Sequence, residues 1–394
     1  MQSPDAPFYS PFKCPQCGGN LSASAETTIV CQYCGTTLIA APAQNTPGET
    51  RPALVRGLRL KMFTYTDTQG TGLELFRMLM PVGWQFQGGC NWLLDNPGMP
   101  ATVSLRISNP QGAEAFEIFP SMNFVWNNNP FSRGMFPVGS RYFGAEVRPV
   151  MGVCDAMHNL LLPRYRSGVQ NLRILNEEPQ PDLPKLARSE APLAGGSAEG
   201  GKMRIQFTWQ GQTYEEEIYG VVEVLRIPIS SMFGQNELYY WYLNFLFSFR
   251  AAAGRLDDAG KLFYVMISSF RLNPHWAAAY KSIIQSLIQG QIQRIHHIGQ
   301  IGQIYAQTGR EMREQNLRDW YSRQEVYDRL STDWSREIRG VDAFYDPHRE
   351  EVVELPSGYG NAWANDLGEY ILTEDTTFNP NLYSTQHWEP MEQK

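Results

Sequence analysis

Two pairs of cysteines near the start of the chain restrict its fold more than any other feature of the sequence. Each pair forms a C-x-x-C turn followed by a glycine, and the ligands are Cys14, Cys17, Cys31 and Cys34. Such a turn directs two sulfur atoms at one ion, and four thiolates complete a tetrahedral zinc site with no position open for a substrate. A redox dithiol and coincidence are the alternatives, and the matching glycines favour a structural Zn²⁺ ion.

The segment at about 10–40 resembles the zinc ribbons found at the termini of many otherwise unrelated bacterial proteins, which implies a structural metal and no particular chemistry. Lys13 is the only basic residue before position 51, and phosphate binding needs clustered Lys or Arg. A structural or protein-contacting ribbon is therefore favoured over a nucleic-acid reader. The counter-argument is the basic stretch Arg51–Lys61, whose alternative interpretation is a solvated strand and linker.

The rest of the 394 residues predicts an α+β protein. We expect a zinc ribbon at 1–40, a linker at 41–52, an antiparallel-sheet-rich central domain at 53–175 and 203–273, a Pro/Gly-rich linker or insert at 176–202, a long helix or helical pair at 274–340, and a small acidic β-rich cap at 341–394. Period-two alternation of apolar residues predicts strands in the central domain. The expected strands are 58–65, 102–108, 115–119, 203–209, 213–219, 239–251 and 262–270, with a short helix at 155–162.

Short motifs in the central domain resemble the Mog1/PsbP-like class. Pro81-Val82-Gly83-Trp84 follows a helix-like segment, and Ile267-Ser268-Ser269-Phe270-Arg271 precedes Trp276 in a late strand-and-helix arrangement, after Phe249–Asp257. The resemblance implies an antiparallel sheet flanked by helices, and a mostly non-catalytic role in binding and assembly. The insert at 176–202 departs from a compact version of that class.

Isoleucines recur at every third position in the predicted helical arm. On a helix each step of three residues turns by about −60°, so five of them sweep most of the circumference. A helix that packs on one core needs an apolar stripe of only somewhat over 100°, so this helix must be surrounded by its own domain or by other copies. We favour other copies and predict a homo-oligomer, with interface residues Ile292, Ile295, Ile298, Ile301, Ile304, Trp320 and Trp334.

The sequence offers little support for catalysis. It contains no zinc-protease, nucleophile-elbow, phosphate-loop or dinucleotide-binding motif. Cys154 and His158 would share one helical face, and such pairing activates thiol nucleophiles. No third orienting residue is identifiable, and a buried free cysteine is the more common situation. We therefore predict no catalytic residue and no bound organic cofactor.

Charge is distributed unevenly along the chain. Residues 342–394 carry eleven acidic and two basic side chains, a net charge of −9, whereas the rest of the chain carries +2. This acidic end either confers solubility or docks on a basic patch of another copy or of a partner. Arg51–Lys61 and Arg310–Arg339 are the candidate patches.

We expect a cytoplasmic protein, because no signal-peptide pattern or long apolar run is present and the cysteine pattern fits a reducing compartment. The favoured function is a non-catalytic scaffold that self-associates or binds protein partners. The alternatives are an enzyme or ligand-binding protein with a pocket in the central domain, and a nucleic-acid adaptor that uses the ribbon and Arg51–Lys61.

Overall fold

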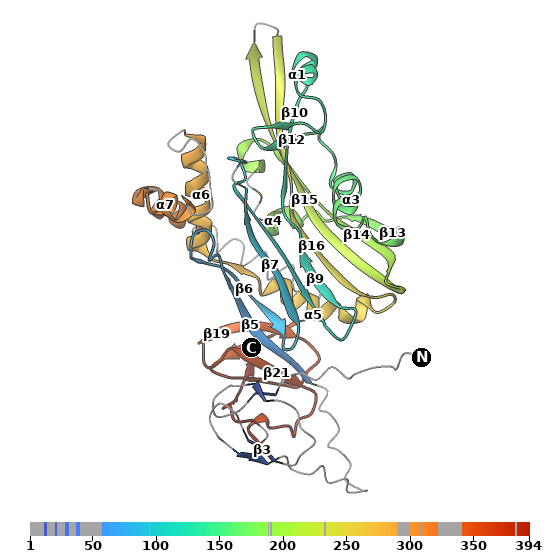
Figure 1. Cartoon of the computed structure of the whole chain (residues 1–394), viewed down its shortest axis with the longest axis vertical. Coiled ribbons are helices and arrows are strands. Elements are labelled where there is room, and N and C mark those ends of the chain that lie inside the picture. Colours follow the sequence, from blue (N-terminus) through green and yellow to red (C-terminus); the bar gives the residue numbers. More distant parts are fainter. Residues whose placement is uncertain are drawn as a thin grey trace. The chain divides into compact units, whose positions relative to one another are not determined.

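The computed structural model describes residues 57–93, 95–187, 189, 191–231, 234–289, 300–307, 309–321, 341–382 and 384–394, together with four short strands before residue 40. The chain divides into two compact units, Met1–Val55 and Arg56–Lys394 (Figure 1). In the first unit, two antiparallel pairs form: β1 (Phe12–Lys13) with β2 (Asn20–Leu21), and β3 (Thr28–Val30) with β4 (Thr37–Ile39). The four cysteines lie outside the described residues, so the zinc ribbon stays a prediction.

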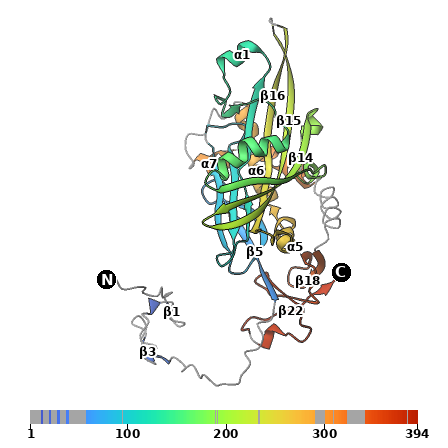
Figure 2. The same cartoon turned by 90° about the vertical axis from the view of Figure 1, so that its right-hand side faces the viewer.

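A ten-stranded sheet forms the centre of the second unit, and both views show its long strands running side by side (Figures 1 and 2). Every pairing is antiparallel except that of β10 with β12. The main path is β11 (Arg141–Tyr142), β12 (Ala145–Val147), β10 (Met122–Asn127), β16 (Gly234–Ala252), β15 (Gln212–Ser231), β14 (Ser197–Trp209) and β13 (Gln170–Pro179). From β16 the sheet also continues into β9 (Ala115–Ile118), β8 (Ala101–Ser108) and β7 (Gln85–Trp92).

A second sheet combines strands from the start of this unit with strands from the C-terminal region. Its order is β17 (Arg271–Leu272), β6 (Glu74–Pro81), β5 (Gly57–Thr66), β21 (Glu369–Thr373), β20 (Asn361–Ala364) and β22 (Glu389–Pro390). A three-stranded sheet joins β19 (Glu351–Pro356), β18 (Val341–Asp346) and β23 (Glu392–Gln393). The C-terminal region is therefore rich in strands, and these strands share a sheet and a core with β5 and β6.

Helices cover parts of these sheets, so the α+β class with antiparallel sheets is confirmed. The longest are α5 (Leu256–Ser268) and α6 (Pro274–Ile288). The others are α1 (Pro130–Met135), α2 (Val153–Ala156), the π-helical η1 (Met157–Leu161), α3 (Leu162–Tyr165), α4 (Leu183–Leu186), α7 (Gln300–Gln307), and the 3₁₀ turns η2 (Ala191–Ala194) and η3 (Pro380–Leu382). Within the predicted helical arm, 274–288, 300–307 and 310–321 are helical, and residue 309 is not.

Asn273 begins α6 in the expected way. Its side-chain oxygen accepts the N–H of His275 at 2.8 Å, and Pro274 occupies the first helical position, where its missing N–H costs nothing. The indole of Trp276 then donates to Asp67 at 3.1 Å, and the indole of Trp92 donates to the same carboxylate at 3.2 Å. Asp67 is almost fully buried, so these bonds fix α6 against the turn between β5 and β6.

Three local predictions were wrong. Residues 262–270 were expected as a strand, but most of them belong to α5, because an unbroken apolar run does not distinguish a strand from a buried helix. The helix-like segment before Pro81 is strand β6. The expected linker at 176–202 contains the start of β14, where Gly200 and Gly201 leave room for packing: a Cβ on Gly201 would lie 2.6 Å from a methyl of Val153.

Candidate interaction surface

The β15–β16 hairpin extends well beyond the strands that flank it. Strand β14 pairs with β15 only as far as Val224, and β10 pairs with β16 only from Leu238 onwards. Residues 225–229 of β15 therefore have no neighbour on their outer edge among the described strands. We call residues 225–240 the hairpin extension; its described strand residues lie at the top of the unit in Figure 1. Two-stranded ribbons are marginal in water by themselves, so the extension needs further contacts.

A small lobe at 128–147 supports the hairpin extension on one side. The Asn128 N–H donates to the Glu237 carbonyl at 3.2 Å, and the Glu237 N–H donates to the Asn128 side chain at 2.9 Å. The two segments also share a small core of their own, in which the rings of Phe136 and Tyr142 lie 4.9 Å apart at a steep angle. The other members of this core are Val125, Trp126, Ala145, Val147, Leu238 and Tyr240.

Helix α1 in this lobe buries none of its six residues. Short helices in proteins depend on a packed apolar face, yet α1 presents Phe131 to solvent with 71% of its surface exposed. Phe143, in the turn between β11 and β12, is 75% exposed and has a positive φ of 47°. A non-glycine residue in this conformation carries a cost of roughly 1–3 kcal/mol, which points to a functional constraint.

Together the lobe and the hairpin extension hold six of the fifteen large hydrophobic side chains that are exposed in the described part of the chain. Isolated exposed apolar residues need no explanation, but a gathering of them marks an interaction site. We call this set the distal surface: Phe131, Met135, Val138, Phe143, Ile227 and Ile229.

The free edge of the hairpin extension is protected against pairing with another strand. Pro228 supplies no N–H, and the neighbouring Arg226 places a charge at the edge and pairs with Glu237 across the hairpin. Proline and charged residues are the usual means by which proteins block edge-to-edge pairing. A partner would therefore contact the apolar face, not the strand edge.

The distal region is also basic. Residues 128–148 and 225–240 contain four arginines and two glutamates, which gives a net charge of +2. Arg133 lies 5.8 Å from the centre of the Trp126 ring, and Arg141 makes only a long, exposed ion pair of 3.7 Å with Asp95. Exposed pairs of this kind contribute little to stability, so Arg141 can exchange Asp95 for an acidic partner.

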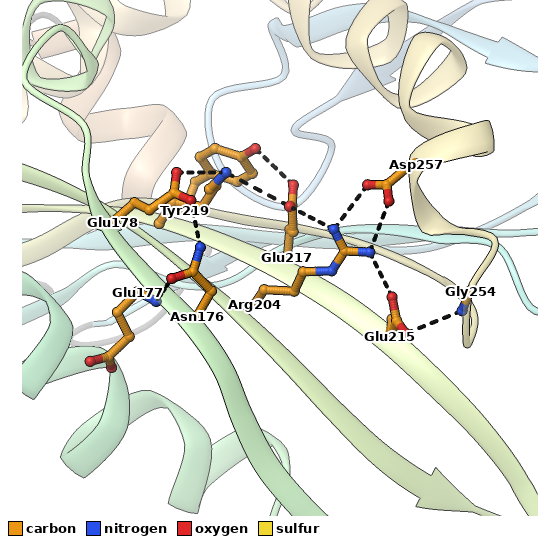
Figure 3. Close-up of polar contacts among 10 residues, drawn as sticks. Asn176, Glu177, Glu178, Arg204, Glu215, Glu217, Tyr219, Gly254 and Asp257 are labelled. Carbon is orange, nitrogen blue, oxygen red and sulfur yellow. Dashed lines mark hydrogen bonds and ion pairs between the residues drawn. The ribbon is translucent and has the colours of Figure 1, made fainter.

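At the other end of the hairpin the charged side chains already satisfy one another (Figure 3). Arg204 of β14 contacts Glu215 at 2.6 Å and Asp257 at 2.9 Å, and Lys202 contacts Glu178 at 3.0 Å. Hydrogen bonding to Asp257, with Glu215 in support, raises the pKa of Arg204 against the opposing effect of burial. This network ties β13, β14, β15 and α5 together.

The structure places two of the predicted interface residues inside the chain. Ile301 is fully buried and Ile304 nearly so, and both belong to the core that includes Leu75 and Ile283. They are therefore not available for contacts between copies, which corrects that part of the prediction. Trp320 is half-buried, whereas Ile292, Ile295, Ile298 and Trp334 lie outside the described residues.

The two described cysteines are not activated. Burial raises the pKa of Cys154, and the nearby carboxylates of Glu177 and Glu199 raise it further. A thiol nucleophile needs a lowered pKa, which is the opposite of the shift at Cys154. Among the residues that the structure describes, no group of three or more His, Cys, Asp or Glu side chains is placed to hold a metal ion.

The predicted basic patch is engaged within the chain. Arg59 on β5 donates to Glu369 on β21 at 2.6 Å and lies 5.4 Å from the centre of the Trp388 ring. The described part of Arg51–Lys61 thus binds the acidic C-terminal region of the same chain. Arg59 is therefore paired with a carboxylate of its own chain, although 45% of its side chain stays exposed.

No protein-family model matches the chain, and a comparison with curated proteins finds no relative. None of the described helices has the length and apolar character needed to cross a bilayer.

Proposed function

We propose that the protein is a non-catalytic scaffold that self-associates, with the distal surface of one copy docking on the acidic C-terminal region of the next. The observation that carries the proposal is the exposed apolar set on and around α1, a helix with no buried residue of its own. Association buries such a surface and removes its contact with water.

The acidic C-terminal region fits the distal surface in charge and in apolar character. Its net charge of −9 opposes the +2 of the distal region. It also exposes Val352, Leu367 and Leu382, each by more than half of its surface. Opposite charges at an interface steer association and select the partner.

The two surfaces belong to different parts of the fold, so the contact is head-to-tail. Strand β16 starts in the hairpin extension and ends at Ala252, just before α5, and α5 packs on the C-terminal sheets through Val265. A head-to-tail contact closes into a ring if its rotation allows and otherwise continues as a filament. We therefore expect assemblies larger than a dimer.

Light scattering tests this proposal on the full chain. We expect the mean mass to rise above 44.8 kDa with concentration in the micromolar range. The variant Phe131→Ser/Phe143→Ser should weaken association by about tenfold or more, because two anchors of the contact are lost. The matched control is Ile288→Ser, which replaces an equally exposed apolar side chain at the end of α6. A monodisperse monomer, or equal loss in the control, would contradict the proposal.

Charge reversal tests the partner surface separately. Arg133→Glu/Arg141→Glu should weaken association, and so should Asp366→Lys/Glu374→Lys in the C-terminal region. A mixture of the two variants should recover association between unlike copies, because the unaltered distal surface of the second variant can dock on the unaltered C-terminal region of the first. If the mixture stays dissociated, the distal surface binds something other than the C-terminal region.

The zinc ribbon and the cytoplasmic location remain parts of the same proposal. Four cysteines in two C-x-x-C turns support one structural Zn²⁺ ion per chain, held by Cys14, Cys17, Cys31 and Cys34. Metal analysis of the purified protein tests the stoichiometry.

A further inference from the structure

A cluster of charged side chains, of which Glu216 is fully buried, crosses one face of the ten-stranded sheet. Arg106 on β8 lies opposite Glu117 on β9, and Glu117 lies opposite Ser248 on β16. Arg250, two residues along β16, lies opposite Glu216 on β15. Residues that face each other across neighbouring strands project from the same side of the sheet. These strands therefore bring several charged groups into one region.

Arg166 closes the cluster from the end of α3. Its guanidinium donates to Glu216 at 2.7 Å and to Glu117 at 2.9 Å, and Glu216 also accepts the hydroxyl of Ser248. Burial would raise the pKa of Glu216, which has no exposed surface, but the Arg166 guanidinium outweighs that effect and holds the pKa below its usual value. Both glutamates are thus already committed to Arg166.

Two arginines of the cluster remain without a carboxylate. Arg250 is held by the rings of Tyr214 and Trp209, and its pKa is lowered by burial and by the positive charge of Arg106. Arg106 makes no ion pair with any described residue, and its Nε is buried without a hydrogen-bond partner. The three arginines and two glutamates leave a net charge of +1. A buried guanidinium atom without a hydrogen-bond partner is costly, and the charge of Arg106 has no carboxylate to balance it.

A depression of about 220 Å³ lies directly against Arg106. Polar side chains of Gln87, Ser104 and Tyr165 line it together with Arg106 and Glu117, and Phe119 and Pro120 form an apolar part of the wall. Its size suits a small molecule, since pockets for drug-sized ligands are larger, at roughly 300–1,000 Å³. Its charge suits a single negative group.

We propose that this depression binds a small organic monocarboxylate, with Arg106 donating to the carboxylate and Phe119 and Pro120 contacting the apolar portion. Guanidinium and carboxylate groups match in planar, two-point geometry, and a carboxylate only accepts hydrogen bonds, as Arg106 requires. One carboxylate would bring the net charge of the cluster from +1 to zero. The proposal concerns binding alone, and no covalent bond of the ligand is made or broken.

Calorimetric titration with benzoate and with its neutral analogue benzamide tests the proposal on the full chain. We expect benzoate to bind at least about tenfold more tightly than benzamide, because only benzoate pairs with the guanidinium. Arg106→Gln should weaken benzoate binding by about tenfold or more and leave benzamide binding unchanged. The matched control is Arg173→Gln, an exposed arginine on β13 whose side chain contacts only Gln206.

Glu117→Gln provides a second variant with an effect in the opposite direction. Glutamine still accepts the hydrogen bond from Arg166, but the site loses a negative charge beside the ligand. Benzoate binding should then strengthen by about threefold or more, an effect that a purely structural role of the cluster would not produce. Equal binding of benzoate and benzamide, unchanged binding in Arg106→Gln, weaker binding in Glu117→Gln, or no binding up to about 50 mM would each overturn the proposal. None of these outcomes depends on self-association.

Discussion

The two ends of the β15–β16 hairpin belong to the same pair of strands but occupy opposite environments. Around Glu216 and Ser248 the two strands are flanked by β14 and β9, and Glu216 has both a cation and a hydroxyl beside it. Beyond Val224 strand β15 loses its neighbour β14, beyond Leu238 strand β16 loses its neighbour β10, and Ile227 and Ile229 are exposed. Side-chain composition does not separate the two ends, since both alternate apolar and polar residues. The neighbouring strands decide which end becomes core and which becomes surface.

The largest loss of stability should come from disrupting the charge cluster around Glu216, at the buried end of the hairpin. Arg166→Met leaves Glu216 buried without its main partner, so the free energy of unfolding should fall by about 3–5 kcal/mol. Urea denaturation followed by circular dichroism measures the change. The matched control is the exposed Arg173→Met, which should change the free energy by less than about 0.5 kcal/mol. The double variant Arg166→Met/Glu216→Met should recover about half of the loss, because the fully buried carboxylate of Glu216 no longer lacks its partner.

Acid should weaken the same end of the hairpin. The folded-state pKa of Glu216 lies below its ordinary value, so its contribution to stability is present above the unfolded pKa and is lost as pH falls through the folded pKa. The unfolding free energy of the natural protein should therefore fall towards that of Glu216→Gln below about pH 4. Urea titrations between neutral and acidic pH measure both curves. Parallel curves throughout would show that Glu216 does not titrate with unfolding.

Removing the exposed end should have a small effect on stability and a large one on association. Ile227 and Leu238 lie opposite each other, so residues 228–237 can be replaced by Asn-Gly, a preferred two-residue hairpin turn. The unfolding free energy should change by no more than about 1 kcal/mol, because the deleted residues belong to none of the main cores. Light scattering should show weaker self-association. A large loss of stability would mean that the extension supports the body of the sheet.

The smallest effect on either end of the hairpin should come from zinc removal. The four predicted ligands belong to the first compact unit, whereas the hairpin belongs to the second. Cys14→Ser should abolish zinc binding, detected by metal analysis, and shift the main thermal unfolding midpoint by less than about 2 °C. A collapse of the main transition would show that the metal supports the second unit.

The sequence predicted local structure best where one pattern dominated. Alternation at Val103, Leu105 and Ile107 marks β8, and Gln210-Gly211 forms the turn between β14 and β15, with positive φ at both residues. The predicted strand at 213–219 ended at Tyr219, however, whereas β15 continues to Ser231. Proline and polar residues near the tip conceal the extension, because they are also typical of a loop.

The candidate interaction surface could not be predicted from the sequence. Phe131 and Phe143 stand among prolines, glycines and asparagines, and no local pattern distinguishes an exposed phenylalanine from a buried one. For Ile301 and Ile304 the error was the reverse, because a contact with another copy was expected and burial within the chain was found. Their spacing correctly indicates burial, but it does not say whether the same chain or another copy covers them. Arg106 and Glu117 were also missed, because their proximity depends on strand pairing.

The pairing of β5 with β21 has a consequence for the synthesis of the protein. One edge of β5, including Leu60, stays open until Thr373 and its neighbours have left the ribosome, more than 300 residues later. Pairings so distant in sequence form late in folding because closing a long loop costs entropy. A chain that terminates early therefore exposes an apolar strand edge. Such an edge distinguishes incomplete products from finished ones and offers a binding site to the chaperones and proteases that remove them.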